Sequence, residues 1–296
     1  MILSRERARC RTSAGSGSIA KAAREQEGSW TGTQRQRRRS AKMATEAAAA
    51  SPAGDWALWQ MVDSLYPTGG FAHSLGLEAA AQEGLVTAQS PESLRRFLSA
   101  SLHQAANFAL PIVFSAHRAT SSAAADDPAM LVDALLARNA EATALYSNHV
   151  ARKASFAQGA ALLRLALSTY GAGVEPRARR FQALLTLRKE FKRRKHAGLH
   201  HAVLFGAVCA LLGLTADATQ RMYLFVTTRD VLSAATRLNL VGPLEAARLQ
   251  FETAPLLERV YLAKKDREMR DSYSSAPVLD LVQAMHDQLY TRIFNS

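Results

Sequence analysis

The chain has 296 residues, of which 48% are hydrophobic and 21% charged, a composition that supports a folded core and excludes a largely disordered protein. Its two cysteines, Cys10 and Cys209, stand far apart, which excludes a disulfide framework and favours a reducing compartment, the cytoplasm. The formal net charge is +12, but residues 1–42 hold eleven Lys/Arg and three Glu, so this leader contributes +8 and leaves the remainder only mildly basic.

Residues 1–54 are predicted to be a disordered, basic and alanine-rich leader outside the fold. Three interpretations of residues 1–42 stay open: an organelle transit peptide, an arm that binds nucleic acid, or a segment upstream of a true start at Met43. The third is favoured because runs of charge are usually solvated or dispensable, and a transit peptide comes second. We therefore expect a cytoplasmic protein.

Residues 55–263 are predicted to form a single all-α domain of about ten helices. Two helices are expected to begin at Ser90-Pro91-Glu92 and at Asp127-Pro128, where a capping residue precedes a first-turn proline. Further helices are predicted over 148–170, 176–191 and 199–212, from the cap Thr215 onward, and again after Gly242-Pro243. No stretch alternates polar and apolar residues long enough to predict a strand.

Residues 264–296 are predicted to be a connector followed by a separately docked C-terminal helix. The connector 264–275 is charged and expected to be mobile, as is the Ser/Ala/Asp loop 120–127. The last helix is expected to start at Pro277 and to carry one apolar stripe: Val278, Leu281, Val282, Met285, Leu289 and Ile293. The longest run of apolar or glycine residues, 202–214, is shorter than the roughly 20 residues of a membrane span.

The glycine-rich segment Tyr66–Phe71 does not predict a nucleotide site. No GK[ST] follows it, so it lacks the lysine and hydroxyl of a phosphate-binding loop, and a tight turn between helices explains Pro67 and the glycines. With no nucleophile–base set elsewhere, the sequence predicts a protein that is not an enzyme.

Three histidines are weak candidates for a metal site: His196, His200 and His201. The spacing of His196 and His200 could place two imidazoles on one side of a helix, but no Cys or carboxylate stands close by to complete a ligand set. A structural or transient role is favoured over a metal-dependent enzyme. Cys209 lies among apolar residues and is interpreted as a core residue.

The run Arg188–Lys195 is strongly basic and ends a predicted helix. A solvated helix face is the favoured interpretation, with partner docking as a middle case. Phosphate contact is the alternative, and together with the leader it gives the second functional hypothesis, a helical nucleic-acid-binding protein.

Three sequence blocks closely resemble the UreF family of urease accessory proteins. The first block places Asp63, Ser64, Pro67, Gly69, Phe71, Ser74, Gly76, Leu77 and Glu78 in the family pattern. The second runs from 229 to 246 and contains Arg229, Ser233, Arg237, Gly242, Pro243 and Glu245. The third resembles the tail of plant and algal members through Asp280, Gln283, His286, Asp287, Leu289, Tyr290, Arg292 and Phe294. The likeness covers the chain from about Trp56 onward, with Ala202 standing where relatives usually have proline.

The resemblance implies an all-helical, non-catalytic homodimer that pairs with UreD (UreH in some bacteria) and recruits the GTPase UreG to the urease apoprotein. It implies no intrinsic cofactor, because nickel and GTP are handled by the complex. The blocks are then expected to shape partner surfaces, with fold maintenance as the competing role of each residue. Gly69, Gly76 and Gly242 are expected to serve backbone geometry, and Asp63, Glu78 and Arg237 internal hydrogen bonds. A membrane partner is not expected, and nucleic acid is disfavoured.

Overall fold

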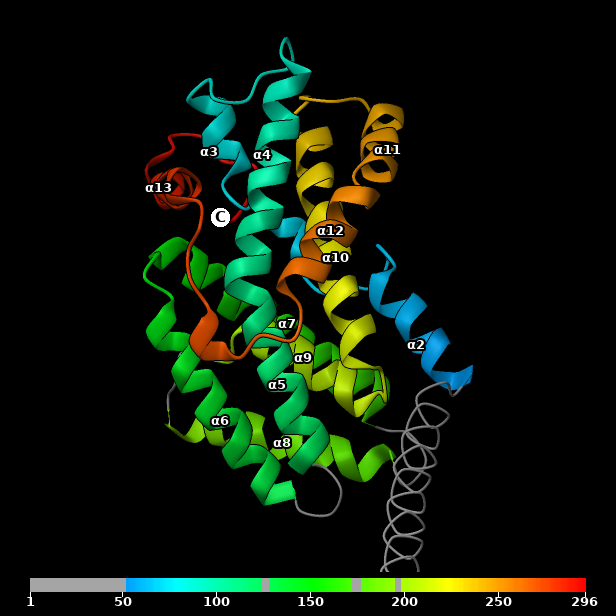
Figure 1. The fold of residues 1–296 in the computed structure, drawn as a ribbon. Helices are drawn as coiled ribbons and strands as arrows, with labels where there is room; N and C mark the ends of the chain where they lie inside the picture. Colours follow the sequence, from blue (N-terminus) through cyan, green and yellow to red (C-terminus); the bar gives the residue numbers. More distant parts are fainter. Residues whose placement is uncertain (1–51, 124–127, 172–176, 195–197) are drawn as a thin grey trace, which may run out of the picture. The chain divides into compact units, whose positions relative to one another are not determined.

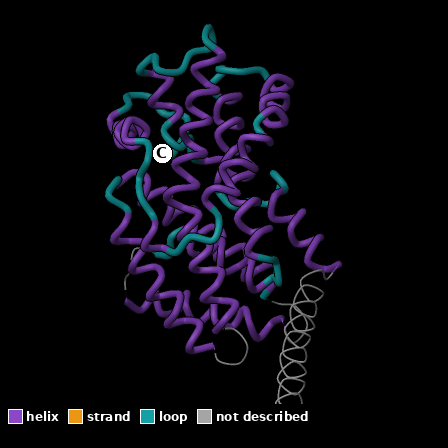
Figure 2. Tube along the Cα trace, viewed as in Figure 1, coloured by secondary structure: helices purple, strands orange, loops and turns teal. Residues whose placement is uncertain are grey.

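The computed structural model describes residues 52–123, 128–171, 177–194 and 198–296, and within them every regular element is helical (Figures 1 and 2). The first half contains α2 (Pro52–Val62), η1 (Gly70–Ala72), α3 (Leu77–Gln82), α4 (Pro91–Gln104), η2 (Ala105–Ala109), α5 (Leu110–Ala123), α6 (Pro128–Leu145) and α7 (His149–Tyr170). The second half contains α8 (Arg177–Arg194), α9 (His201–Leu211), α10 (Ala216–Arg237), α11 (Pro243–Glu252), α12 (Ala254–Lys264), η3 (Met269–Asp271), α13 (Pro277–Met285) and η4 (His286–Gln288). The predicted all-α class is confirmed.

Capping residues fix several helix starts where the sequence predicts them. The Asn148 side chain accepts hydrogen bonds from the backbone N–H groups of Val150 and Ala151, and Thr215 Oγ1 accepts one from Ala218. Pro91 occupies the first turn of α4, where its missing N–H costs nothing. These starts are therefore encoded by a few local residues.

The helix α9 lies at the centre of the larger core, packed against α5, α6 and α7. Nearly all of its side chains are buried, Cys209 among them, which confirms the interpretation of that cysteine as a core residue. Fully burying a large apolar side chain stabilises a fold by roughly 1.5–3 kcal/mol, so this helix organises the domain. A second core joins α3, α4, α11, α13 and the end of α10.

α4, η2 and α5 form one continuous rod (Figure 1). By length and hydropathy its stretch 91–122 is the one candidate membrane span within the described residues, but 61% of the qualifying window is buried inside the protein. Such burial is what a core helix of a helical domain shows.

Three local expectations are corrected. α13 ends at Met285 and not near Ile293, and only Val282 of the predicted stripe is fully buried, while Val278, Leu281 and Ile293 are exposed. α5 extends to Ala123, so the expected loop from Thr120 starts later, and its remainder, 124–127, lies outside the described residues.

The connector differs from the mobile segment that its charge predicts. Met269 is buried in the larger core, and its backbone N–H donates to Ser115 Oγ over 2.8 Å. The Arg267 guanidinium donates to the carbonyl oxygen of Ala106 over 2.7 Å. The segment is thus held along the α4–α5 rod.

Candidate functional site

Three segments that lie far apart in the sequence meet at one place: the loop 63–78, the end of α10, and the C-terminal residues 286–296. Figure 1 shows the C-terminus beside α3, α4 and α13. These are the segments that carry the three sequence blocks, so the fold joins patterns that the sequence could only place separately.

Glu78 is the centre of this junction. Its side chain, at the start of α3, is 1% exposed and accepts hydrogen bonds from the backbone N–H groups of Ile293 (2.5 Å) and Phe294 (3.1 Å). His286 Nε2 lies 3.1 Å from the same carboxylate. A buried carboxylate is tolerated only when donors satisfy it, so Glu78 and the C-terminal segment require each other.

The last residues run along the loop and are fixed by it. Ser74 donates to the carbonyl oxygen of Ser296 through its backbone N–H (2.6 Å) and its hydroxyl (3.0 Å), and His73 Nδ1 lies 2.6 Å from Ser296 Oγ. The N–H of Asn295 donates to the Ala72 carbonyl over 2.8 Å. Burial, and then the proximity of His286, lowers the pKa of His73 to about 4, so its ring is neutral at neutral pH.

A buried ion pair on α10, Arg229–Asp230, packs against the loop 63–78. The Arg229 guanidinium donates to Asp230 Oδ1 over 2.8 Å and to the Val62 carbonyl over 2.8 Å, and it lies over the Phe71 ring at 4.9 Å. Burial raises the pKa of Asp230, and the paired Arg229 opposes that rise. A Cβ at Gly70 would overlap Asp230 Oδ2, so only glycine lets the loop approach this closely.

Two of the three motif glycines have the backbone conformation expected of them. Gly69 and Gly76 have φ angles of +83° and +88°, in the left-handed region that disfavours other residues. Gly242 has a φ angle of −74°, and a methyl group added to its Cα would meet open space, so its backbone does not require glycine. The expectation for Gly242 is therefore wrong.

Arg237 joins all three segments. Its guanidinium donates to the Phe71 carbonyl and lies over the Phe294 ring at 4.3 Å. Asp63 likewise has an internal role, since its Oδ1 accepts from the Leu65 N–H over 2.9 Å. The expected internal hydrogen bonds of Asp63, Glu78 and Arg237 are all present.

Other predicted residues lie outside the junction or at its edge. Leu77 is buried and Ser233 half-buried, whereas Ser64 and Pro67 are exposed. Glu245 belongs to α11 after Gly242 and Pro243, where it pairs with Arg248 at 2.8 Å. Arg292 pairs with Asp287 at 3.4 Å, and Asp280 on α13 faces a cavity. Tyr290 is fully exposed.

The two weak metal candidates that the structure describes, His200 and His201, belong to no group that could hold a metal ion. His196 lies outside the described residues, and no group of three His, Cys, Asp or Glu side chains within them could hold a metal. Both ring nitrogens of His200 are engaged, Nδ1 with Ser155 Oγ at 3.0 Å and Nε2 with Thr143 Oγ1 at 3.1 Å. Burial lowers the pKa of His200 and of His201 to about 4.

Most polar groups of the described junction residues pair with one another, although the buried Nδ1 of His286 has no hydrogen-bond partner among the described residues. Side chains available to other molecules lie on the outer surface of the junction. Exposed large apolar side chains there include four from α13 and the C-terminal residues, which we call the C-terminal patch: Val278, Leu281, Tyr290 and Ile293. Exposed apolar side chains of this size are typical of a protein interaction surface where they adjoin one another.

Comparison with known proteins agrees with this architecture. The UreF family model matches residues 88–254. The urease accessory protein F of Oryza sativa subsp. japonica is 41% identical over 250 residues, which cover 84% of this chain and 88% of the relative. The chain belongs to the UreF family.

Other UreF-family relatives span similar lengths. The urease accessory protein F of Arabidopsis thaliana is 40% identical over 247 residues, covering 83% of this chain and 95% of the relative. The urease accessory protein UreF of Trichodesmium erythraeum is 29% identical over 241 residues, covering 80% and 95%. The family resemblance drawn from the three blocks is confirmed.

Sequence reasoning missed several members of the UreF-type junction. Asp230, His73 and Ser296 were not singled out as site residues, although Asp230 contacts Arg229, Ser296 contacts Ser74, and His73 contacts Ser296. The partners of His73 and Ser296 lie more than 160 positions away in the sequence, and the role of Asp230 depends on how closely the loop 63–78 approaches α10. A single sequence gives no information on such long-range contacts. All three residues lie inside the three blocks that resemble the family, which was the indication that the sequence offered.

Proposed function

We propose that this chain is a non-catalytic adaptor in urease maturation, which binds a UreD-type protein and the GTPase UreG while nickel is inserted into the urease apoprotein. In this role nickel and GTP are cargo and substrate of the complex, and the chain needs no cofactor of its own. The relatives named as urease accessory proteins support the process, and the junction supports the mode of action.

The observation that carries the proposal is the way Glu78 holds the C-terminal segment. Its contacts with Ile293, Phe294 and His286 fix the backbone, while the side chains of Leu281 and Tyr290 remain exposed. A rigid backbone that presents apolar side chains loses little conformational entropy on binding. We assign UreD to the C-terminal patch for this reason.

Removing residues 277–296 would test this assignment poorly, because it would also strip Glu78 of its buried donors and unfold the junction. Point variants on the exposed side are sharper. The experiment is co-purification of the full chain with UreD and UreG from the same host, with and without GTP and nickel, using Leu281→Ser and Tyr290→Ser. Met130→Ser, which changes an exposed apolar residue on α6, is the matched control.

We expect the wild type and Met130→Ser to form a stable complex, and the two patch variants to bind UreD at least about tenfold more weakly, since central apolar contacts dominate interfaces. Unchanged circular dichroism would show that the variants fold. If both patch variants bind UreD as the wild type does, the C-terminal patch is not the interface. If the folded wild type binds neither partner, the adaptor role itself fails.

The homodimer and the cytoplasmic setting belong to this proposal as well. Light scattering of the purified full chain should give twice the mass of 32.1 kDa. A monomer at micromolar concentration would contradict the dimer without affecting the test of UreD binding.

A further inference from the structure

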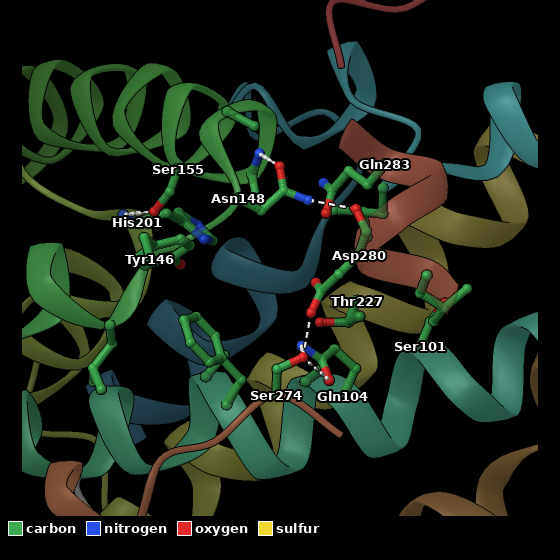
Figure 3. A pocket seen from close by; sticks show the side chains of 18 of the residues that line it. Ser101, Gln104, Tyr146, Asn148, Ser155, His201, Thr227, Ser274, Asp280 and Gln283 are labelled. Atoms are coloured by element: carbon green, nitrogen blue, oxygen red, sulfur yellow. Dashed lines mark hydrogen bonds between the residues drawn. The ribbon is translucent and has the colours of Figure 1, made fainter. Parts of the chain in front are cut away.

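A cavity of about 350 Å³ lies between α4, η2, the start of α7, α13 and the connector, and it borders the loop 63–78 of the Glu78 junction at Leu75. Figure 3 shows side chains from these elements turned toward it, with Tyr146, Ser155 and His201 on one side and Asp280, Ser274 and Gln104 on another. The proposed adaptor role makes no use of this space.

The cavity is built around a π-helical turn, η2, at the point where the rod passes from α4 to α5. This turn interrupts the regular hydrogen bonds of the α-helix, and residues of the connector donate hydrogen bonds to its backbone carbonyl groups instead. The Tyr273 N–H donates to the Asn107 carbonyl over 3.2 Å, and Ser272 Oγ donates to the Phe108 carbonyl over 2.5 Å. Phe108 and Tyr273 consequently line the cavity.

Hydrogen bonds also fix the opposite wall. Asn148 caps α7 with its Oδ1 and donates from Nδ2 to the Asp280 carbonyl over 2.8 Å. Gln104 Oε1 accepts from the N–H groups of Ser275 (2.7 Å) and Ala276 (3.0 Å), just before α13. The space is therefore preformed, as ligand sites usually are.

Polar groups on the wall lack partners among the residues that the structure describes. Asp280 accepts from Ser274 Oγ through Oδ2, which leaves Oδ1 without a hydrogen bond. The His201 ring and the Tyr223 hydroxyl also line the cavity with no hydrogen bond to the described part of the chain. These atoms are not fully buried but open to the cavity, where a bound ligand would pair with them.

The charges of the residues that line the cavity favour a positively charged ligand. Its residues include no Lys or Arg and one carboxylate, Asp280, although the chain after residue 42 carries a net +4, the whole-chain +12 less the +8 of the leader. Burial lowers the pKa of His201 to about 4, so the ring adds no positive charge at neutral pH. Aromatic side chains complete the wall, with the rings of Phe108 and Tyr146 at 4.8 Å, and aromatic faces attract cations.

We propose that this cavity binds a small organic cation, a primary alkylammonium or a guanidinium, with its charged head at Asp280 and its apolar body against Phe108, Tyr146 and Tyr223. The head group would donate to Asp280 Oδ1, and His201, on the same side of the cavity as Tyr146, would border the apolar body. An anion of the same size would meet the carboxylate and is excluded.

The test is isothermal titration of the full chain at low ionic strength with three isosteres: benzylammonium, neutral benzyl alcohol and benzoate. We expect benzylammonium to bind at least tenfold more tightly than benzyl alcohol, and benzoate not to bind. Asp280→Asn should reduce benzylammonium affinity about tenfold, as expected for a charge-assisted hydrogen bond, and leave benzyl alcohol unchanged. Asp133→Asn, an exposed carboxylate on α6, is the charge-matched control.

A second variant separates the cavity from the charge. Ala151→Leu would fill the space from α7 and abolish binding of both benzylammonium and benzyl alcohol, whereas Ala160→Leu on the exposed side of the same helix would not. A capped Gly-Arg-Gly peptide that binds better than benzylammonium would support the site with a partner's side chain as its ligand, and the reverse would support a free amine. Equal binding of benzoate, or no effect of Asp280→Asn and Ala151→Leu, would overturn the proposal.

Discussion

Individual residues in the junction work as pairs whose members are far apart in sequence. Gly70 is one example, because its missing side chain makes room for Asp230, which in turn holds Arg229. The role of this glycine comes from a contact and not from its own backbone, whereas Gly69 and Gly76 are needed for positive φ angles.

Gly70→Ala should therefore lower the free energy of unfolding by about 2 kcal/mol, the usual cost of overpacking a filled site. Gly242→Ala is the matched comparison. Its methyl group would meet open space, and the lower entropy of the unfolded chain offsets the poorer capping by alanine, so we expect a change within about 0.5 kcal/mol. Urea denaturation followed by circular dichroism measures both. Equal losses in the two variants would show that Gly70 is not held against Asp230.

The buried histidines make stability depend on pH. His73, His200 and His201 have their pKa values lowered to about 4 by burial, against about 6.5 in the unfolded chain. Between pH 6.5 and pH 4 the unfolded state therefore binds more protons than the folded state. Stability is complete above this window and is lost as the pH falls through it.

His201→Gln should reduce the slope of unfolding free energy against pH, between pH 6 and 4.5, by up to about 1.4 kcal/mol per pH unit. The comparison is Phe205→Leu, which removes ring packing against His201 at 5.7 Å but no titrating group. That variant should shift stability equally at every pH and leave the slope unchanged. A wild-type slope retained by His201→Gln would mean that this ring takes up no proton on unfolding.

At the scale of elements, local chemistry predicted where helices begin better than where they end. Asn148, Thr215 and Pro91 act within a few residues of themselves, so their helix starts could be predicted from sequence. The end of α13 at Met285 could not, because the following residues turn back to reach Glu78, a contact more than 200 positions away. The apolar stripe of 278–293 instead divides between the core and the exposed patch.

The site was predictable in part for the same reason. The three blocks named most residues of the junction, but their meeting depends on tertiary pairing that periodicity does not contain. The cavity at Asp280 was not predicted at all. It arises from the π turn at Ala105–Ala109 and from a connector whose charges suggested exposure to solvent.

At this scale, the hydrogen bonds between Gln104 of α4 and the connector can be tested. Gln104 binds the backbone of Ser275 and Ala276 through one oxygen and Ser274 through its nitrogen at 3.1 Å. Gln104→Ala should cost about 1 kcal/mol of local stability, because these hydrogen bonds are partly exposed, and so raise trypsin cleavage within 264–275 about fivefold. His103→Ala, its exposed neighbour, should cleave at the wild-type rate. No difference between the variants would show that Gln104 does not hold the connector.

At the scale of the whole folded unit 52–296, α10 links the two main cores. Met222 and Val226 belong to the larger core around α9, and Val231 and Leu232, further along the same helix, belong to the core beneath α3 and α4. A small cluster around Tyr261 includes Leu224 of the same helix. A rigid helix shared by both cores should make them unfold together.

Cys209 allows this coupling to be measured from one core while the other is weakened. The chain has two cysteines, so Cys209 carries the one thiol that remains in a Cys10→Ser variant. Cys209 is fully buried, and burial raises the pKa of its thiol. A labelling reagent therefore reacts with it only when the protein opens. Leu232→Ala removes a buried side chain from the distant core at a cost of about 3 kcal/mol. If opening is global and reclosing is fast, Cys209 should then be labelled about a hundredfold faster, in step with the lost free energy measured by urea denaturation. Unchanged labelling beside a lower unfolding free energy would instead show that the core around α9 stays closed while the region that holds Glu78 and the C-terminal patch opens separately.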